Sequence, residues 1–184
     1  MLKGELTGLR AIEQDDLPKL LEWRNRPEFR RYFREHRELS MTQQSKWFES
    51  TVINDSRTLM FAIVELTSQR LLGACGLCYI DWVNKSADFS IYIGVDDLYI
   101  DDLYAPDAAY TMARYAFDEL CMHRLWCEIY DFDLPKKSFL EQLGFTLDGR
   151  HRQTHWCEGA WHDSLFWGLL SSDSISKHRS DLVT

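Results

Sequence analysis

The sequence lacks any run of about 18 consecutive apolar residues, the length that a helix needs to span a bilayer. Its N-terminal residues also lack the combination of a basic flank, an apolar stretch and a small-residue cleavage site that marks a secretory signal peptide. The residues therefore indicate neither a membrane segment nor an export signal. We expect a cytoplasmic protein with no membrane partner.

Basic residues are in short supply. Lys and Arg total 21 against 29 Asp and Glu, which gives a formal net charge of −8. Because nucleic-acid binding needs clustered Lys and Arg to contact phosphates, we expect no nucleic-acid partner. An acidic surface is compatible with a cationic amine substrate, although it also serves solubility alone.

Cysteine is limited to five residues, an odd number, and most lie inside apolar runs, which is typical of reduced, buried thiols. Cys75 and Cys78 form a C-x-x-C pair. In a strand, side chains three positions apart point to opposite faces, and no second pair or His couple completes a zinc set. A redox or metal role for this pair is an alternative reading, and we expect no metal.

Hydrophobic periodicity predicts a strand and two helices in the first third of the chain. Residues 6–12 alternate weakly, and the acidic cluster at 13–16 can cap a following helix. Pro27 should end or interrupt that helix. Ser40 or Thr42 can cap a second one.

The rest of the chain predicts sheet and helix in alternation. Runs of strand formers at 59–64, 71–80 and 87–94 indicate a three-stranded antiparallel meander. Apolar residues at helical spacing then predict a long helix from about Pro106. The elements expected after it are a strand at 125–132, a helix at 135–143 closed by Gly144, and strands at 145–150 and 161–170.

Several ordered segments carry a resemblance to a known family. They are Ser-Ala-Asp-Phe-Ser-Ile-Tyr-Ile-Gly at 86–94, Tyr-Ala-Phe-Asp-Glu-Leu-Cys-Met-His-Arg-Leu-Trp at 115–126, and Glu-Gln-Leu-Gly-Phe-Thr-Leu-Asp-Gly-Arg at 141–150. With Glu-Trp-Arg-Asn at 22–25 and Lys-Trp-Phe-Glu at 46–49, the chain resembles the GNAT superfamily. It is most similar to the branch of polyamine, ribosomal-protein and nucleotide-amino-sugar acetyltransferases.

This resemblance implies an α/β fold, the GNAT acyl-CoA N-acyltransferase fold, in which a mixed, mostly antiparallel sheet is flanked by helices. We expect a single GNAT-like domain at 1–170 and a polar C-terminal tail at 171–184. The implied activity is acetyl-CoA-dependent N-acetyltransfer, in which a primary amine attacks directly within a ternary complex. Acetyl-CoA would be the co-substrate, the amine a small molecule or a peptide, and the assembly a possible homodimer.

In this family, the pantetheine arm of acetyl-CoA pairs with the backbone of a strand that splays from its neighbour. The resemblance places Ile91, Tyr92 and Ile93 on that strand. Backbone recognition tolerates changes of side chain, so the sequence does not test these positions.

The family grips the pyrophosphate through a Q/R-x-x-G-x-G/A motif at the start of the long helix, where backbone N–H groups and the helix dipole favour an anion. Here only the final small residue, Ala105, fits. We expect backbone groups of Tyr104, Ala105 and Asp107 to bind the pyrophosphate, with Asp101 and Asp102 turned outward, because like charges at about 4 Å repel by about 1 kcal/mol in water. The departure leaves a second hypothesis open, a catalytically silent GNAT-fold binding module with weakened CoA binding.

Acetyl transfer needs a neutral amine and therefore a proton acceptor. Glu128 matches the glutamate that serves as base in some relatives, although a strand glutamate in an ion pair is the alternative. The position of the family's tyrosine acid holds Leu140, so Tyr130 is the substitute that we consider.

The amine pocket is expected around the segment after the first helix and beyond the first hairpin, at Arg34, Glu35, His36 and Trp82. Arg34 suits the phosphates of a nucleotide sugar, whereas Glu35 suits a polycation. The substrate class stays open, and a solvated helix face with aromatic packing is the alternative for this cluster.

Overall fold

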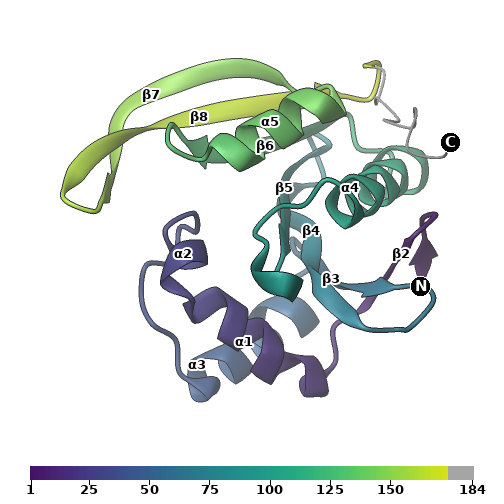
Figure 1. Ribbon diagram of the computed structural model, residues 1–184. Coiled ribbons are helices and arrows are strands. Elements are labelled where there is room, and N and C mark those ends of the chain that lie inside the picture. Colours follow the sequence, from purple (N-terminus) through teal and green to yellow (C-terminus); the bar gives the residue numbers. More distant parts are fainter. Residues whose placement is uncertain (174–184) are drawn as a thin grey trace, which may run out of the picture.

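The computed structural model describes residues 1–173, so residues 174–184 of the predicted tail lie outside the described part of the chain. The strands are β1 (Leu2–Lys3), β2 (Thr7–Ala11), β3 (Leu59–Glu65), β4 (Leu71–Asp81), β5 (Ser86–Ile93), β6 (Arg124–Tyr130), β7 (Thr146–Cys157) and β8 (Ala160–Leu170). They form one sheet in the order β1-β2-β3-β4-β5-β6-β8-β7 (Figure 1).

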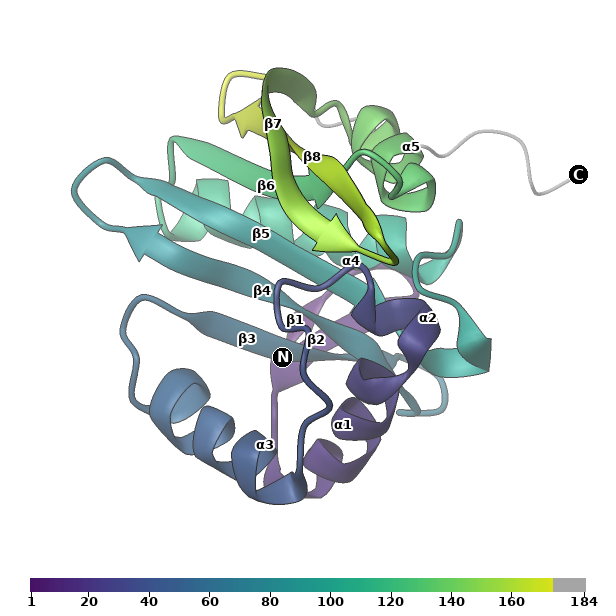
Figure 2. The ribbon, with the colours of Figure 1, turned by 90° about the vertical axis from the view of Figure 1, so that its left-hand side faces the viewer.

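Helices cover both faces of this sheet. They are η1 (Gln14–Asp16), α1 (Leu17–Asn25), α2 (Pro27–Arg30), α3 (Met41–Trp47) with its continuation η2 (Phe48–Ile53), η3 (Val95–Asp97), α4 (Tyr104–Arg114) with its continuation η4 (Tyr115–Glu119), and α5 (Leu134–Leu143). Figure 2 shows α1 and α3 in front of the sheet and α4 behind it. The predicted mixed, mostly antiparallel sheet flanked by helices is therefore confirmed.

Local sequence signals set the helix ends where they were predicted. The hydroxyl of Ser40 accepts from the N–H of Gln43, whose side chain accepts from the N–H of Ser40, and this reciprocal cap starts α3. Pro27 occupies the first turn of α2 after an extended Arg26, which separates α2 from α1. Gly144 ends α5 with a φ of 92°, a left-handed conformation that favours glycine.

Three features were not predicted from the sequence. The two-residue strand β1 and the four-residue helix α2 are too short to show a periodic pattern. The strand expected at 145–150 continues as β7 to Cys157, and most of its side chains are exposed. As an edge strand it buries little, so its residues lack the alternation that would have revealed it.

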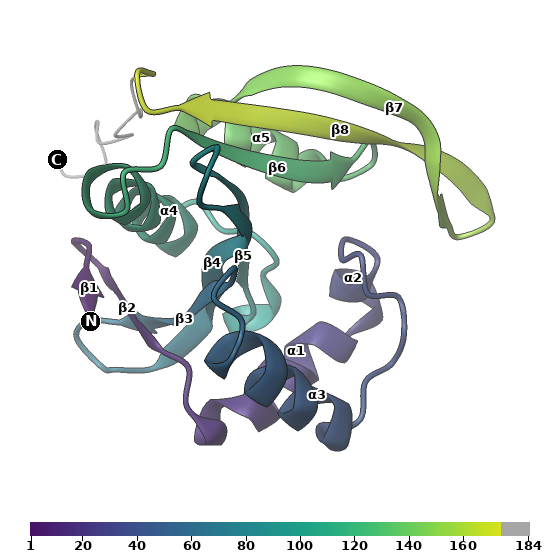
Figure 3. The ribbon, with the colours of Figure 1, turned by 180° about the vertical axis from the view of Figure 1, so that it is seen from behind.

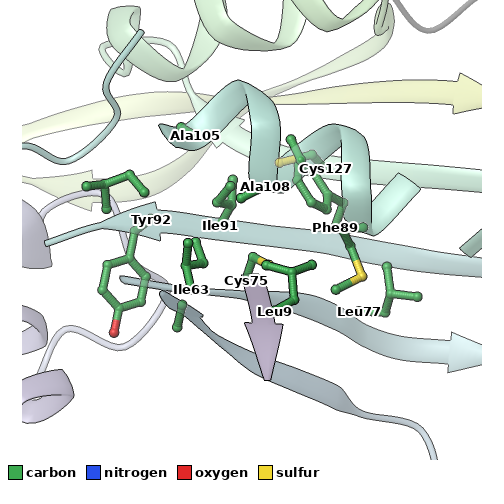
Figure 4. Close-up of a cluster of buried hydrophobic side chains, with 14 of the residues drawn as sticks. Leu9, Ile63, Cys75, Leu77, Phe89, Ile91, Tyr92, Ala105, Ala108 and Cys127 are labelled. Atoms are coloured by element: carbon green, nitrogen blue, oxygen red, sulfur yellow. The ribbon is translucent and has the colours of Figure 1, made fainter. Parts of the chain in front are cut away.

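The buried core lies on both faces of the sheet, and β5 contributes side chains to each face. Figure 4 shows Phe89 and Ile91 directed toward Ala105 and Ala108 of α4, while the ring of Tyr92 points the opposite way. This alternation is the period of two that a strand imposes. The alternate residues of β5 therefore face α4 on one side and the layer of α1 to α3 on the other.

One pair of neighbouring strands in the sheet is parallel, β5 with β6, and it separates early. The pairing joins Ser86 to Arg124, Ala87 to Leu125 and Asp88 to Trp126, and the register ends there. Strand β6 stays paired with β8 through Tyr130. Beyond Asp88 the two strands are no longer paired and their backbones diverge (Figure 3); we call the interval between these two backbones the gap.

Within residues 1–173, no helix is long and apolar enough to cross a membrane.

Candidate functional site

The candidate site is the gap between residues 89–93 of β5 and 127–130 of β6. Its backbone edge can be assigned because the N–H and C=O groups of successive strand residues point to alternate edges. The N–H of Gly94 donates to the carbonyl of Leu72 on β4 at 2.8 Å. Ile91 and Ile93 therefore present their main-chain groups to the gap.

For Tyr92 the same alternation corrects the expectation. Its main chain faces β4, where it is registered with Ala74, and its ring packs edge-on against Phe33 with 5.5 Å between centroids. Tyr92 cannot pair through its backbone with a ligand in the gap. Of the three strand residues expected to bind pantetheine, the geometry suits Ile91 and Ile93.

Groups of the chain itself hold the gap edge of β5. The ammonium of Lys136, on α5, donates to the carbonyl of Ile91 at 3.1 Å, and the N–H of Ile93 donates to the carbonyl of Tyr99 at 2.9 Å. Both contacts use main-chain groups that a pantetheine arm would need. Lys136 is buried, with 7% of its surface exposed, so its charge lies within the protein.

Tyr99 is an unpredicted component of the gap. Tyr99 is 8% exposed, and its ring stacks on that of Tyr32 with 4.4 Å between centroids. The rings of Phe29 and Phe33 lie 6.0 and 6.1 Å away. The Tyr99 hydroxyl donates to Asp133 at 3.1 Å, and this burial beside a carboxylate raises the pKa of Tyr99 well above its usual value.

At the start of α4, the side chain of Asp101 does not point outward as expected from the sequence. The Asp101 carboxylate accepts from the N–H groups of Tyr104 at 2.9 Å and of Ala105 at 2.7 Å. A helix N-terminus leaves such donors without partners inside the helix, and an acceptor there satisfies them. Asp101 thus occupies two of the donors that were assigned to the pyrophosphate, and it points inward.

Asp107 has a structural role in this conformation. Its carboxylate accepts from the N–H groups of Glu5 at 2.9 Å, Leu6 at 3.0 Å and Thr7 at 2.8 Å, and from the Thr7 hydroxyl at 2.7 Å. These bonds fasten the turn between β1 and β2 to α4. The Asp107 carboxylate is therefore committed to this turn, while the expectation for Asp107 concerned its backbone.

On the opposite face of the sheet, Arg34 bridges the two strands where their pairing ends. Its guanidinium lies 2.6 Å from Asp88 on β5 and 2.9 Å from Glu128 on β6. It also lies over the rings of Tyr79 and Trp126, at 5.6 and 5.8 Å from the centroids. Two carboxylates and two aromatic faces form a site that holds a cation.

The charged groups of this cluster change one another's pKa values. Burial raises the pKa of Asp88, and the nearby Arg34 only partly opposes that rise. The two carboxylates raise the pKa of Arg34 against its own desolvation, so it stays charged. The predicted base Glu128 therefore sits in an ion pair, as the alternative reading of this residue anticipated.

For the other substrate residues predicted from the sequence, the structure shows contacts with groups outside this cluster. Glu35 pairs locally with Arg37, which lowers the pKa of Glu35 to about 2, and His36 is exposed. Trp82 lies in the turn between β4 and β5, where its indole N–H donates to the carbonyl of Ser56 at 3.0 Å.

Neither Tyr130 nor Leu140 matches the tyrosine that serves as general acid in the family. Burial raises the pKa of Tyr130 to about 12, and its ring stacks on His155 at 3.6 Å between centroids. The Nε2 atom of His155 is buried without a hydrogen-bond partner among the described residues. Leu140 is fully buried, so its position contributes packing.

Sequence reasoning missed Tyr99, Lys136 and the inward Asp101. One signal was available for Lys136, which shares a helical stripe with Leu140 and Leu143 at i, i+4 and i+7, the pattern of a buried face. Asp101 lies three residues before the observed start of α4 at Tyr104, but five before the predicted start at Pro106, so its capping role was missed. Nothing local marked Tyr99, because its contacts come from distant parts of the chain.

A sheet that parts between two parallel strands, beside the N-terminus of a long helix, defines the class of GNAT-type acyltransferases. A family model described as an acetyltransferase (GNAT) domain matches residues 7–146. The chain belongs to the GNAT acetyltransferase family, a family of acyltransferase enzymes.

Two curated relatives extend over nearly the whole chain. The SPbeta prophage-derived uncharacterized N-acetyltransferase YokL of Bacillus subtilis (strain 168) is 24% identical, over 95% of this chain and 96% of that protein. The uncharacterized N-acetyltransferase p20 of Bacillus licheniformis is 23% identical, over 94% and 97%.

Solved structures agree on the fold. The spermidine N-acetyltransferase from Vibrio cholerae in complex with CoA and spermine superposes with a TM-score of 0.83 at 21% identity, over 91% of this chain and 96% of that one. An acetyltransferase (GNAT family) from Bacillus anthracis superposes with a TM-score of 0.78 at 16% identity, over 92% and 98%. At these identities the likeness establishes the fold.

Proposed function

We propose that this chain is an acetyl-CoA-dependent N-acetyltransferase that passes an acetyl group directly to a primary amine. The observation that supports it most is the gap between β5 and β6, where Ile91 and Ile93 present main-chain groups beside the start of α4. The CoA-bound Vibrio relative has the same fold. The residues fit acetyl-CoA once the internal contacts of Lys136, Tyr99 and Asp101 are exchanged for contacts with it.

The donors at the start of α4 fit a phosphate group. In this structure they already bind an anion, the Asp101 carboxylate, through the N–H groups of Tyr104 and Ala105. A phosphate oxygen makes the same kind of hydrogen bond and gains from the helix dipole. Binding there would rest on the main chain, so the missing glycines of the family motif do not remove these two donors.

The reaction would proceed by attack of the neutral amine nitrogen on the thioester carbonyl carbon. The C–N bond forms, the C–S bond breaks, and the amine proton passes to Glu128 directly or through water. Arg34 binds Glu128 through the Oε2 atom, which leaves Oε1 for that proton. Proximity of the two substrates within the ternary complex would supply a further part of the rate.

Tyr130 would assist the leaving sulfur through a hydrogen bond. Its pKa of about 12 keeps the hydroxyl protonated at neutral pH. An ordinary thiol has a pKa of about 8.5, so full transfer of the phenolic proton to the thiolate is unfavourable. We propose that the thiolate takes its proton from water.

The amine is proposed to be cationic in its free form. Asp88 and Glu128 carry two negative charges at the end of the strand pairing, against the single positive charge of Arg34, and aromatic rings flank them. Small-molecule or peptide amines meet this description. A homodimer is our expectation for the assembly.

A thiol-release assay over amino sugars, polyamines and N-terminal peptides tests the proposal. We expect Glu128→Gln to lower kcat/KM by about 10²-fold or more, the usual effect of losing a positioned base, without weakening CoA binding measured by calorimetry. Glu141→Gln, an exposed change of the same kind on α5, is the matched control and should leave turnover unchanged.

Two results would contradict parts of this proposal. Full turnover by the Glu128 variant would remove its role as base. No CoA binding at millimolar concentration and no thiol release from any amine would overturn the acetyltransferase proposal and leave the silent binding module.

A further inference from the structure

The segment from Val95 to Leu103, here called the gap segment, runs between the end of β5 and the start of α4. Its middle residue, Tyr99, lies in the space that opens between the two parallel strands. The Tyr99 carbonyl takes the N–H of Ile93, and the ring is buried. The gap segment thus uses the same strand edge that a pantetheine arm would use.

A second contact, from α5, uses a main-chain group on the same edge of β5. Lys136 donates to the carbonyl of Ile91 at 3.1 Å, and its ammonium lies 5.8 Å from the ring centroid of Tyr99. Asp133, the N-cap of the same helix, accepts from the Tyr99 hydroxyl at 3.1 Å. The strand edge, the gap segment and α5 are therefore joined into one network across the gap.

The far end of the gap segment meets α4. Asp101 accepts from the N–H groups of Tyr104 and Ala105, so its carboxylate lies where an anionic group of a ligand would meet the helix. A carboxylate and a phosphate cannot share those donors. The gap segment accordingly conflicts with acetyl-CoA at two separated points, the strand edge and the helix start.

The near end of the gap segment is held by ion pairs at the surface. Asp96 pairs with Arg70 at 2.7 Å, and Asp97 pairs with Arg26. Asp96 and Asp97 both adopt a left-handed backbone, with φ of 55° and 61°, which non-glycine residues rarely adopt. Exposed ion pairs and unfavourable dihedral angles indicate a conformation that a ligand can displace.

We propose that the gap segment is an autoinhibitory plug, with Tyr99 inserted in the co-substrate gap, and that it must leave before acetyl-CoA can bind. The inference rests on the proposed function. The departure of the plug would remove the stacking contact between Tyr99 and Tyr32, while the ion pairs of Arg34 with Asp88 and Glu128 stay in place.

Calorimetric titration of the full chain with CoA gives an apparent Kd, which depends on the fraction of molecules in the plugged state. If the plugged state holds about nine molecules in ten, the apparent Kd is about tenfold higher than that of an open protein. Tyr99→Ala removes the ring that fills the gap and should lower the Kd for CoA by about tenfold. Asp96→Asn weakens only the surface ion pair with Arg70 and should lower it by a smaller factor. Asp118→Asn makes the same charge change at the far end of the helix and should leave the Kd unchanged.

Hydrogen exchange gives a second readout that does not depend on the variants. On addition of CoA to the wild type, amides of residues 95–103 should exchange faster as the plug leaves. Slower exchange there would show a lid that closes over CoA and would overturn the plug.

The outcomes separate the plug from the proposed function. CoA binding of equal strength in the wild type and both plug variants would overturn the plug and leave the acetyltransferase proposal standing. No CoA binding by any of the three proteins would overturn both.

Discussion

Arg34→Met tests how the acidic cluster at the end of the strand pairing is held. Methionine keeps much of the apolar stem that lies over Tyr79 and Trp126 but removes the guanidinium. The Asp88 side chain, 5% exposed, then loses an ion-pair partner at 2.6 Å. Breaking a fully buried pair costs about 3–5 kcal/mol. Because 41% of the Arg34 side chain is exposed to solvent, which screens the charge, we expect a loss of about 1–3 kcal/mol in the free energy of unfolding.

The pH dependence of this loss identifies its cause. Burial already raises the pKa of Asp88, and removing Arg34 removes the main opposing influence, so the pKa rises further. A carboxyl group that binds its proton more tightly when folded makes stability fall as pH rises from its unfolded pKa, about 3.9, through its folded pKa. The deficit of the variant should therefore be largest at pH 8 and should shrink toward pH 4.

Urea denaturation followed by circular dichroism at the two pH values measures the deficit directly. Asp88→Asn added to the Arg34 variant should restore most of the loss at pH 8, because no buried charge is then left unpaired. If Arg34→Met is as stable as the wild type at pH 8, Arg34 does not neutralise a buried carboxylate. The same conclusion follows if the loss in free energy of unfolding is equal at the two pH values.

Three further predictions concern packing, a polar anchor and thiol reactivity. Gly94→Ala should lower the free energy of unfolding by about 1–3 kcal/mol, because a Cβ atom there would overlap the buried ring of Trp23, and urea denaturation measures the loss. Asp107→Ala should cost about 1–3 kcal/mol in the same assay, since it leaves several N–H donors of the first turn without their acceptor. Iodoacetamide at neutral pH should label the exposed Cys121 before Cys78, because burial raises the pKa of the Cys78 thiol to about 12, and peptide mass spectrometry reads the order.

Matched variants give these predictions their controls. A Cβ at Gly149 meets nothing within 4 Å, so Gly149→Ala should leave stability unchanged. Asp102→Ala removes an exposed carboxylate near the same helix and should have little effect. Early labelling of Cys78 would contradict its burial and would favour the redox reading of the C-x-x-C pair.

The sequence predicted the elements whose causes are local. Ser40 and Gly144 set helix ends through contacts within a few residues, so their effects can be read from a short window. The splayed strand was expected from the family resemblance, since no side-chain pattern of β5 marks where its pairing to β6 stops.

The occupied gap could not be predicted because it depends on distant parts of the chain. Tyr99 meets Tyr32 and Asp133, which are far apart in the sequence, and their meeting requires the completed sheet. Asp101 was expected to point outward on the argument of charge repulsion from a ligand. The N–H groups at the start of the helix, which that argument left out, attract the carboxylate and draw it inward.

The edge of β5 that faces the gap has a consequence for how this chain can change over time. Every amino acid except proline supplies the same N–H and C=O groups, so replacing the side chain of Ile91 or Ile93 leaves those groups in place. Selection for these hydrogen bonds therefore acts on the path of the main chain and excludes proline, but it does not fix the side chain. A sequence can drift far at such positions while the shape of the strand persists.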